Sequence, residues 1–332
     1  TRGNRMTISR FSLSKSLVIL PTLLSLAAAL FLAVPSGCAA QESGLTGRLN
    51  TEYFTVHYDP EDPYLAKLMA DTAREELMSI SERLGYEPPK GRPFTLRIYR
   101  NHRDFIRAGG LEERRFVVGT TRLGDESIAV DASGAFVTAR EVLAHEITHA
   151  VIFRLLGIRS LQAPLWFHEG AAKYFSSDSV TDDEILLTAS ATQGTLFPLN
   201  DLTEKFPSGG EPLAYAQSYS AMRYLVREHG ESAPREVLQA LASGLSFDEA
   251  LENAAGMDST EFVSAWHASV SDRSRVVRLT AILGAAGGLL MSILAVIAFI
   301  TRRKRMREAA REWEQEEFEE ALRRQLGNDW SN

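Results

Sequence analysis

The strongest constraint on this chain is a run of 22 residues, Leu279 to Ile300, that contains no charged side chain. A helix of about 20 apolar residues is long enough to cross a lipid bilayer, so this run predicts one transmembrane helix. Five lysines and arginines follow it within residues 302–307, whereas three arginines precede it within residues 273–278. Because the more basic flank of a span stays in the cytoplasm, residues 301–332 are predicted to form a charged cytoplasmic tail.

A second apolar run lies near the start of the sequence, from Leu17 to Val34. Basic residues precede it and the small residues of PSGCAA follow it, which is the pattern of a signal peptide. We therefore expect residues 1–40 to direct export and residues 41–275 to form an extracytoplasmic domain. Two cleavage sites fit equally, a lipoprotein-type site at Cys38 and an ordinary site after Ala40. The alternative is an uncleaved membrane helix, because the run is close to the minimum length that spans a bilayer.

The exported part must fold around a hydrophobic core, because no cysteine follows Cys38 and no internal disulfide can hold it. A segment of this length can bury a core of sufficient size. The net charge of −7 argues against a general nucleic-acid-binding protein, so no nucleic-acid partner is expected.

Hydrophobic periodicity and turn residues predict strands and helices in the first half of this domain and helices in the second. The predicted strands are residues 51–58, 93–100, 115–123 and 127–133. The predicted helices are residues 62–84, 103–108, 137–156, 165–175, 213–229, 233–242, 246–254 and 258–270. The expected fold is therefore α+β, with a small mixed or antiparallel sheet followed by a mainly helical C-terminal lobe and one C-terminal transmembrane helix.

The predicted helix 137–156 carries the sequence HEITH. Residues four apart lie on the same face of a helix, so the imidazoles of His145 and His149 can bind one metal ion. Glu146 lies further around the helix, where its carboxylate can hold a water on that metal but is poorly placed to ligate it. This is the HExxH arrangement. The alternative is a helix with two histidines and an incidental acid.

Catalytic zinc needs a third protein ligand and one open position. The segment WFHEG supplies Glu169 on the next predicted helix, after a short connection that folds it back against the first. The alternative for Glu169 is an acid favoured at a helix start by the helix dipole. His168 is the rival ligand, although as the neighbour of Glu169 it points elsewhere on the helix. The sequence thus predicts one Zn²⁺ per chain, and the absence of a cysteine as fourth ligand favours an open catalytic site over a structural one.

HEITH, followed about twenty residues later by WFHEG, resembles the gluzincins, the thermolysin-like zinc metallopeptidases with an HExxH…E motif. The resemblance is to their small peptidase MA-like domains in exported bacterial proteins and covers residues 50–270. It implies that His145, His149 and Glu169 bind zinc and that Glu146 is the catalytic carboxylate. The chain lacks the GxMEN motif of the large aminopeptidases. It also has Lys173 where thermolysin-like enzymes carry an aspartate behind the histidines.

The resemblance also places the helix 213–229 as a wall of the substrate cleft. Tyr215 on this helix is the candidate donor to the oxyanion, with Tyr219 second; the alternative is that both tyrosines only pack the helix. The strand Ser127–Asp131 is the candidate sheet edge for an extended peptide, with an edge that binds nothing as an equal alternative.

Together these features predict a single-pass membrane protein whose zinc metallopeptidase domain lies outside the cytoplasm. A zinc-activated water would hydrolyse a peptide or protein substrate, with Glu146 as general base. The alternative function is a catalytically silent peptidase-like module that binds peptides or envelope proteins. The intact HEITH motif and Glu169 argue against that alternative.

Overall fold

The computed structural model describes residues 27–31, 44–111, 117–176 and 181–328. The chain divides into two compact units. The first contains the described residues up to Leu187 together with Leu196–Trp266, and the second contains Thr188–Thr195 together with the described residues from His267 onward.

The first unit contains a small mixed sheet, as the sequence predicts. Among the described residues its strand order is β1-β5-β6-β4-β3-β2. The pairs β3–β4, β4–β6 and β1–β5 are parallel, whereas β2–β3 and β5–β6 are antiparallel. The strand bounds are Ala27–Phe31 (β1), Gly47–Asn50 (β2), Phe54–Tyr58 (β3), Phe94–Tyr99 (β4), Val117–Arg122 (β5) and Ser127–Asp131 (β6).

The first predicted strand, 51–58, is shorter in the structure because a turn occupies its first residues. Thr51 makes this turn: its hydroxyl accepts a hydrogen bond from the Phe54 amide, and its own amide donates to the Phe54 carbonyl. The turn joins β3 to the earlier strand β2. This strand was not predicted from the sequence.

The prediction that Ser127–Asp131 forms a sheet edge was wrong. This segment is β6, which lies inside the sheet between β4 and β5. Ile128 and Val130 are fully buried on one face, and Ala129 packs against a buried cluster on the other. A strand that is covered on both faces is typical of a sheet interior. The neighbouring strand β5 lies further out, and β1, from the predicted signal peptide, pairs with its outer edge.

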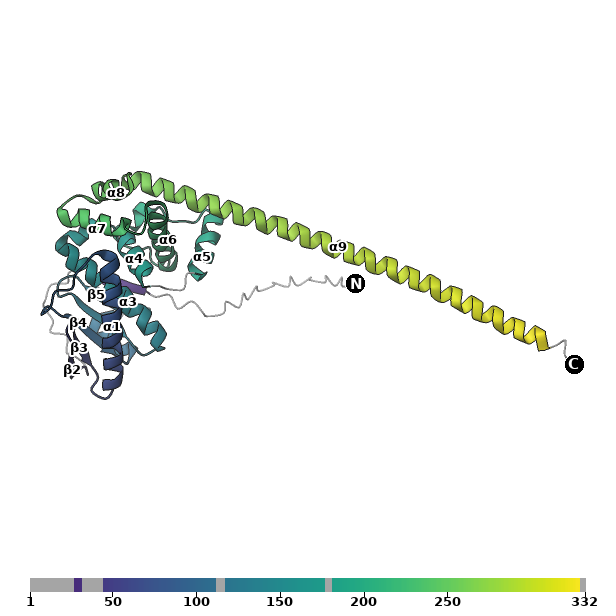
Figure 1. Cartoon of the computed structure of the whole chain (residues 1–332), viewed down its shortest axis with the longest axis horizontal. Helices are drawn as coiled ribbons and strands as arrows, with labels where there is room; N and C mark the ends of the chain where they lie inside the picture. Colours follow the sequence, from purple (N-terminus) through teal and green to yellow (C-terminus); the bar gives the residue numbers. More distant parts are fainter. Residues whose placement is uncertain (1–26, 32–43, 112–116, 177–180, 329–332) are drawn as a thin grey trace, which may run out of the picture. The chain divides into compact units, whose positions relative to one another are not determined.

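Helices pack against both faces of the sheet, and Figure 1 shows α1 and α3 beside the strands. The helices α1 (Pro63–Leu84) and α3 (Phe136–Leu156) pack against each other; α1 contacts β3, and α3 contacts β5 and β6. The helix α2 (His102–Gly109) closes a second cluster of buried residues that includes Tyr99 and Val117. Because successive side chains of a strand alternate between faces, Tyr99 lies in the cluster under α2 and Ile98 lies on the opposite face of the sheet.

The predicted helical lobe follows the sheet. In the first unit, an aromatic cluster of Trp166, Phe167, Phe247 and Phe262 joins its parts, with Trp166 stacked on Phe262 at a centroid distance of 5.6 Å. The helices of the lobe are α4 (Leu165–Phe175), α5 (Thr181–Gln193), α6 (Glu211–His229), α7 (Ala233–Ser243), α8 (Phe247–Ala255) and the start of α9 (Ser259–Asn328), with short 3-10 helices at Gly157–Gln162 (η1) and Leu199–Leu202 (η2).

Most of the second unit is the long helix α9, which also includes the predicted transmembrane segment and tail. The predicted helix 258–270, the span 279–300 and the described part of the charged tail, up to Asn328, are continuous in this one helix. Residues 279–300 are exposed along their whole length, and by length and composition α9 is suited to cross a membrane.

Candidate metal centre

The helix α3 carries the HEITH motif in a stretch that is buried on every side. Each of the residues 144–150 exposes no more than 1% of its surface. The helix contacts β5 and β6 as well as α1, α4 and α7. Two imidazoles and a carboxylate in such surroundings cost stability unless they are hydrogen-bonded or bind a metal. Their burial therefore indicates a site rather than an incidental pattern.

The next helix, α4, brings Glu169 to the same place. After α3, the turn η1 reverses the chain, and α4 begins after Pro164. The Nε2–H group of His168 donates a hydrogen bond to the Ser160 carbonyl in η1 over 2.8 Å, which fixes the first turns of α4. Gly170 allows α6 to approach closely from the other side, because a Cβ at this position would lie 2.4 Å from the Ser218 carbonyl oxygen.

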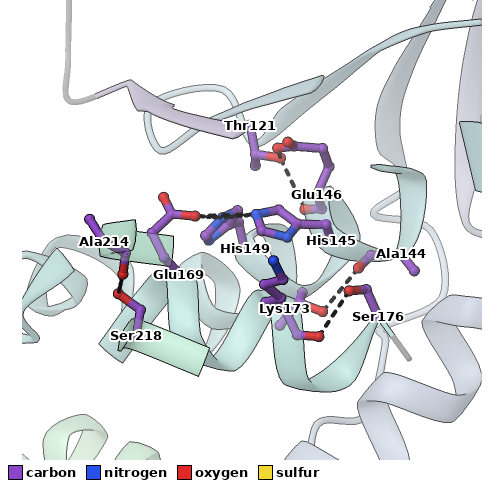
Figure 2. Close-up of polar contacts among 11 residues, drawn as sticks. Thr121, Ala144, His145, Glu146, His149, Glu169, Lys173, Ser176, Ala214 and Ser218 are labelled. Carbon is purple, nitrogen blue, oxygen red and sulfur yellow. Dashed lines mark hydrogen bonds and ion pairs between the residues drawn. The ribbon is translucent and has the colours of Figure 1, made fainter. Parts of the chain in front are cut away.

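Three ligand atoms converge between α3 and α4 (Figure 2). Nε2 of His145 lies 3.2 Å from Nε2 of His149 and 3.2 Å from Oε2 of Glu169, and His149 Nε2 lies 3.6 Å from the same oxygen. A tetrahedral zinc with bonds of about 2.0–2.1 Å separates its ligand atoms by about 3.3 Å. The donor types and their spacing therefore fit one zinc ion held by His145, His149 and Glu169.

The charges of the two buried carboxylates differ because of their surroundings. Burial alone raises the pKa of Glu169, but the neighbouring imidazoles of His149 and His145 outweigh it and hold this pKa at about 2. Glu169 is therefore an anion at neutral pH, which suits it to bind a metal cation. Burial raises the pKa of Glu146 to about 7, against the opposing effects of His149 and of a hydrogen bond from Thr121. Two carboxylates with different proton affinities thus lie near the imidazole of His149.

Thr121 is a residue of the site that the sequence analysis missed. Its hydroxyl lies 2.7 Å from Oε2 of Glu146, while Oε1 of Glu146 has no hydrogen-bond partner among the described residues. A threonine in a predicted strand carries no local signal for such a role, because β-branched residues are common in strands. Only the packing of β5 on α3 reveals the contact.

The structure also shows where the other residues discussed from the sequence lie. Lys173 forms an ion pair with Asp183 of α5 at 2.6 Å. The Nδ1 atoms of both His145 and His149 have no hydrogen-bond partner in the described part of the chain, so no orienting partner replaces the missing aspartate there. His168, the rival ligand, lies outside the donor group.

The two candidate tyrosines lie on α6, which packs against α4. Tyr215 is buried and its ring meets Phe206 edge-on at a centroid distance of 4.9 Å, and Tyr219 lies near Tyr174. Their role at an oxyanion stays a prediction. His102, on α2, lies with Nδ1 2.6 Å from Oδ2 of Asp131 at the end of β6.

The raised pKa of Glu146 predicts a pH-dependent cost to stability in the metal-free protein. In the unfolded chain the carboxyl ionises near 4.5, whereas in the folded chain it holds its proton up to about 7. The folded state binds more protons between these values, so stability falls as the pH rises through this range. Glu146→Gln should remove this loss and raise the free energy of unfolding above pH 7 by on the order of 3 kcal/mol.

Urea unfolding of the full-length chain in detergent with a chelator, from pH 4.5 to 8, measures this difference. Glu169→Gln is the opposite control. The pKa of the Glu169 carboxyl is lowered in the folded chain, so loss of this carboxylate should destabilise the protein at neutral pH. A Glu146→Gln variant whose advantage over wild type does not change with pH would contradict the burial argument.

Comparison with known protein families identifies the family of this chain. The family model of the Peptidase MA superfamily matches residues 72–272, which include α3, α4 and α6 and cover more than half of the chain. No curated protein matches the sequence. The match spans the HEITH helix, the helix of Glu169 and most of the helical lobe. This chain belongs to the Peptidase MA superfamily.

Proposed function

We propose that this protein is a membrane-anchored zinc metallopeptidase that hydrolyses peptide bonds outside the cytoplasm. The observation that carries the proposal is the convergence of His145, His149 and Glu169 beside a carboxylate, Glu146, that is not one of the three donors. Three protein donors leave one position of a tetrahedral zinc open for water or substrate, which is the arrangement of a catalytic site.

Zinc, when bound, would polarise the scissile carbonyl and make a water acidic enough to attack it near neutral pH. Glu146 supplies the proton transfer. Its carboxylate accepts a proton from the attacking water and gives it to the nitrogen of the leaving amine. A carboxylate that is not a metal donor is free to make both transfers.

The substrate would bind as an extended chain along the outer edge of β5, rather than along β6 as the sequence suggested. β5 contacts Glu146 through Thr121, and on its outer side it pairs only with β1 among the described strands. β1 belongs to the predicted signal peptide, and its removal would leave the amides and carbonyls of β5 open for a peptide. Because the donors and Glu146 expose no more than 1% of their surface in the described structure, substrate entry requires the site to open.

The apolar stretch of α9 supports the membrane anchor. The excess of lysine and arginine after residue 301 supports a cytoplasmic tail, with the peptidase domain on the periplasmic or extracellular side.

The test uses the full-length chain purified in detergent. Metal analysis is expected to give one zinc per chain, and a mixture of unstructured peptides should be cleaved. A chelator should stop cleavage, and zinc should restore it. Zinc binding without cleavage of any peptide would favour the silent binding module. A chain that takes up no zinc would overturn the assignment of the donor group.

A further inference from the structure

The strand β5 presents two residues to Glu146 from the face that packs on α3. Thr121 contacts the carboxylate directly, and Gly119 lies two residues earlier on the same face. Neither residue is a metal donor. Both act on the one acidic group of the HEITH motif, so they decide where its two oxygens lie.

The Thr121 hydroxyl donates one proton, and two acceptor atoms of Glu146 lie within hydrogen-bond distance of its oxygen. Oε2 is the nearer at 2.7 Å, and the main-chain oxygen of the same residue lies at 2.9 Å. Thr121 and Glu146 are completely buried, so no solvent competes for this contact. The last torsion of a glutamate is broad when nothing restrains it. A buried hydrogen bond to one oxygen therefore fixes the rotation of the carboxylate.

Gly119 leaves the space that the second oxygen occupies. A Cβ at this position would lie 2.6 Å from Oε1 of Glu146 and 2.5 Å from Cγ1 of Val142. Any side chain at residue 119 would thus push the carboxylate away. Oε1 itself has no hydrogen-bond partner among the described residues, although it is buried. An unpartnered buried carboxylate oxygen needs an explanation, and a role in proton transfer gives one.

We propose that Thr121 is a positioning residue for Glu146 and that Gly119 keeps the space for its free oxygen. The proposal rests on the proposed function. In it, Oε1 takes one proton from the attacking water while the water oxygen bonds to the scissile carbonyl carbon. The carbon–nitrogen bond then breaks, and Oε1 passes this proton to the amine nitrogen. The second water proton stays with the new carboxyl group. Oε2 keeps its hydrogen bond to Thr121 throughout, so the carboxylate does not rotate between the two transfers.

The test compares three substitutions in the full-length chain. Thr121→Val removes the hydroxyl and keeps the shape, and Thr121→Ser keeps the hydroxyl. Thr72→Val makes the same change at a buried threonine of α1, whose hydroxyl donates a hydrogen bond to the Leu68 carbonyl. Thr121→Val should lower kcat about 10–100-fold with unchanged KM and one zinc per chain, whereas Thr121→Ser should stay within about threefold of wild type. Thr72→Val should resemble wild type. A Thr121→Val variant with normal kcat, or a Thr121→Ser variant as slow as Thr121→Val, would overturn the proposal.

A second measurement separates this proposal from the proposed function. If the wild-type chain cleaves no peptide, the function fails, but the contact can still be measured by thermal unfolding of the metal-free chain. Thr121→Val should lower the unfolding midpoint of the wild type and have a clearly smaller effect in a Glu146→Leu background, because the hydroxyl has lost its carboxylate there. Equal shifts in both backgrounds would show that Thr121 does not hold Glu146.

Discussion

Glu146→Gln is expected to reduce peptide hydrolysis by about 10²–10⁴-fold while the chain still binds one zinc. Glutamine has the size of glutamate and still accepts a hydrogen bond from Thr121, but its amide cannot take a proton from water near neutral pH. The three donor atoms belong to other residues, so the metal should remain. The measurement is kcat and zinc content of purified wild-type and variant chains in detergent.

The matched control is Glu141→Gln, which makes the same change on the same helix, at a glutamate that precedes Glu146 by five residues. Glu141 is only half-buried and does not belong to the donor group, so its variant should cleave peptides at the wild-type rate. Equal activity of Glu146→Gln and wild type would remove Glu146 from the mechanism. Loss of zinc from Glu146→Gln would instead mean that Glu146 acts as a ligand.

The convergence of two imidazoles and a carboxylate could be predicted from the sequence because its signal is local. The spacing of His145 and His149 follows from the pitch of one helix, and Gly157 and Pro164 mark the reversal that returns Glu169 to it. The positions of α1, α3, α4 and α6 were predicted for the same reason, since caps and apolar periodicity lie within each segment. The helix α5 was missed, although the acidic residues 182–184 in its first turn are a usual sign of a helix start.

The rest could not be predicted because it depends on contacts between distant segments. Strand order is one case: β6 is interior and β5 lies further out, and the antiparallel pairing of these two strands does not by itself reveal this order. The Thr121–Glu146 contact is another, because it joins residues 25 positions apart on different elements. His168 shows both sides of this limit. Its position beside Glu169 predicts that it points elsewhere on α4, but its hydrogen bond to the Ser160 carbonyl depends on a contact with η1 that the sequence does not reveal.

Removal of a metal donor is the second change with a large expected effect. Glu169→Gln should weaken zinc binding by more than about 100-fold, because substitutions behind the ligands alone cost about 10–100-fold. The physical reason is charge: Glu169 is the anionic donor, and an amide oxygen attracts the cation far less. His145→Ala and His149→Ala should have at least the same effect. Competition with a zinc-binding dye measures all three affinities in the full-length chain.

Two controls decide whether such a loss is specific to the donor group. Glu76→Gln breaks the ion pair between α1 and Arg140 of α3 without touching the donors, so its zinc affinity should equal that of wild type. His168→Asn removes the rival ligand. Its zinc affinity should stay within about tenfold of wild type, because the His168 ring holds α4 in position and does not bind the metal. Loss of zinc from His168→Asn together with its retention by Glu169→Gln would reverse the two assignments. If Glu169→Gln binds zinc weakly while Glu146→Gln still binds one zinc per chain, the residue that holds the metal is distinguished from the residue that transfers the proton.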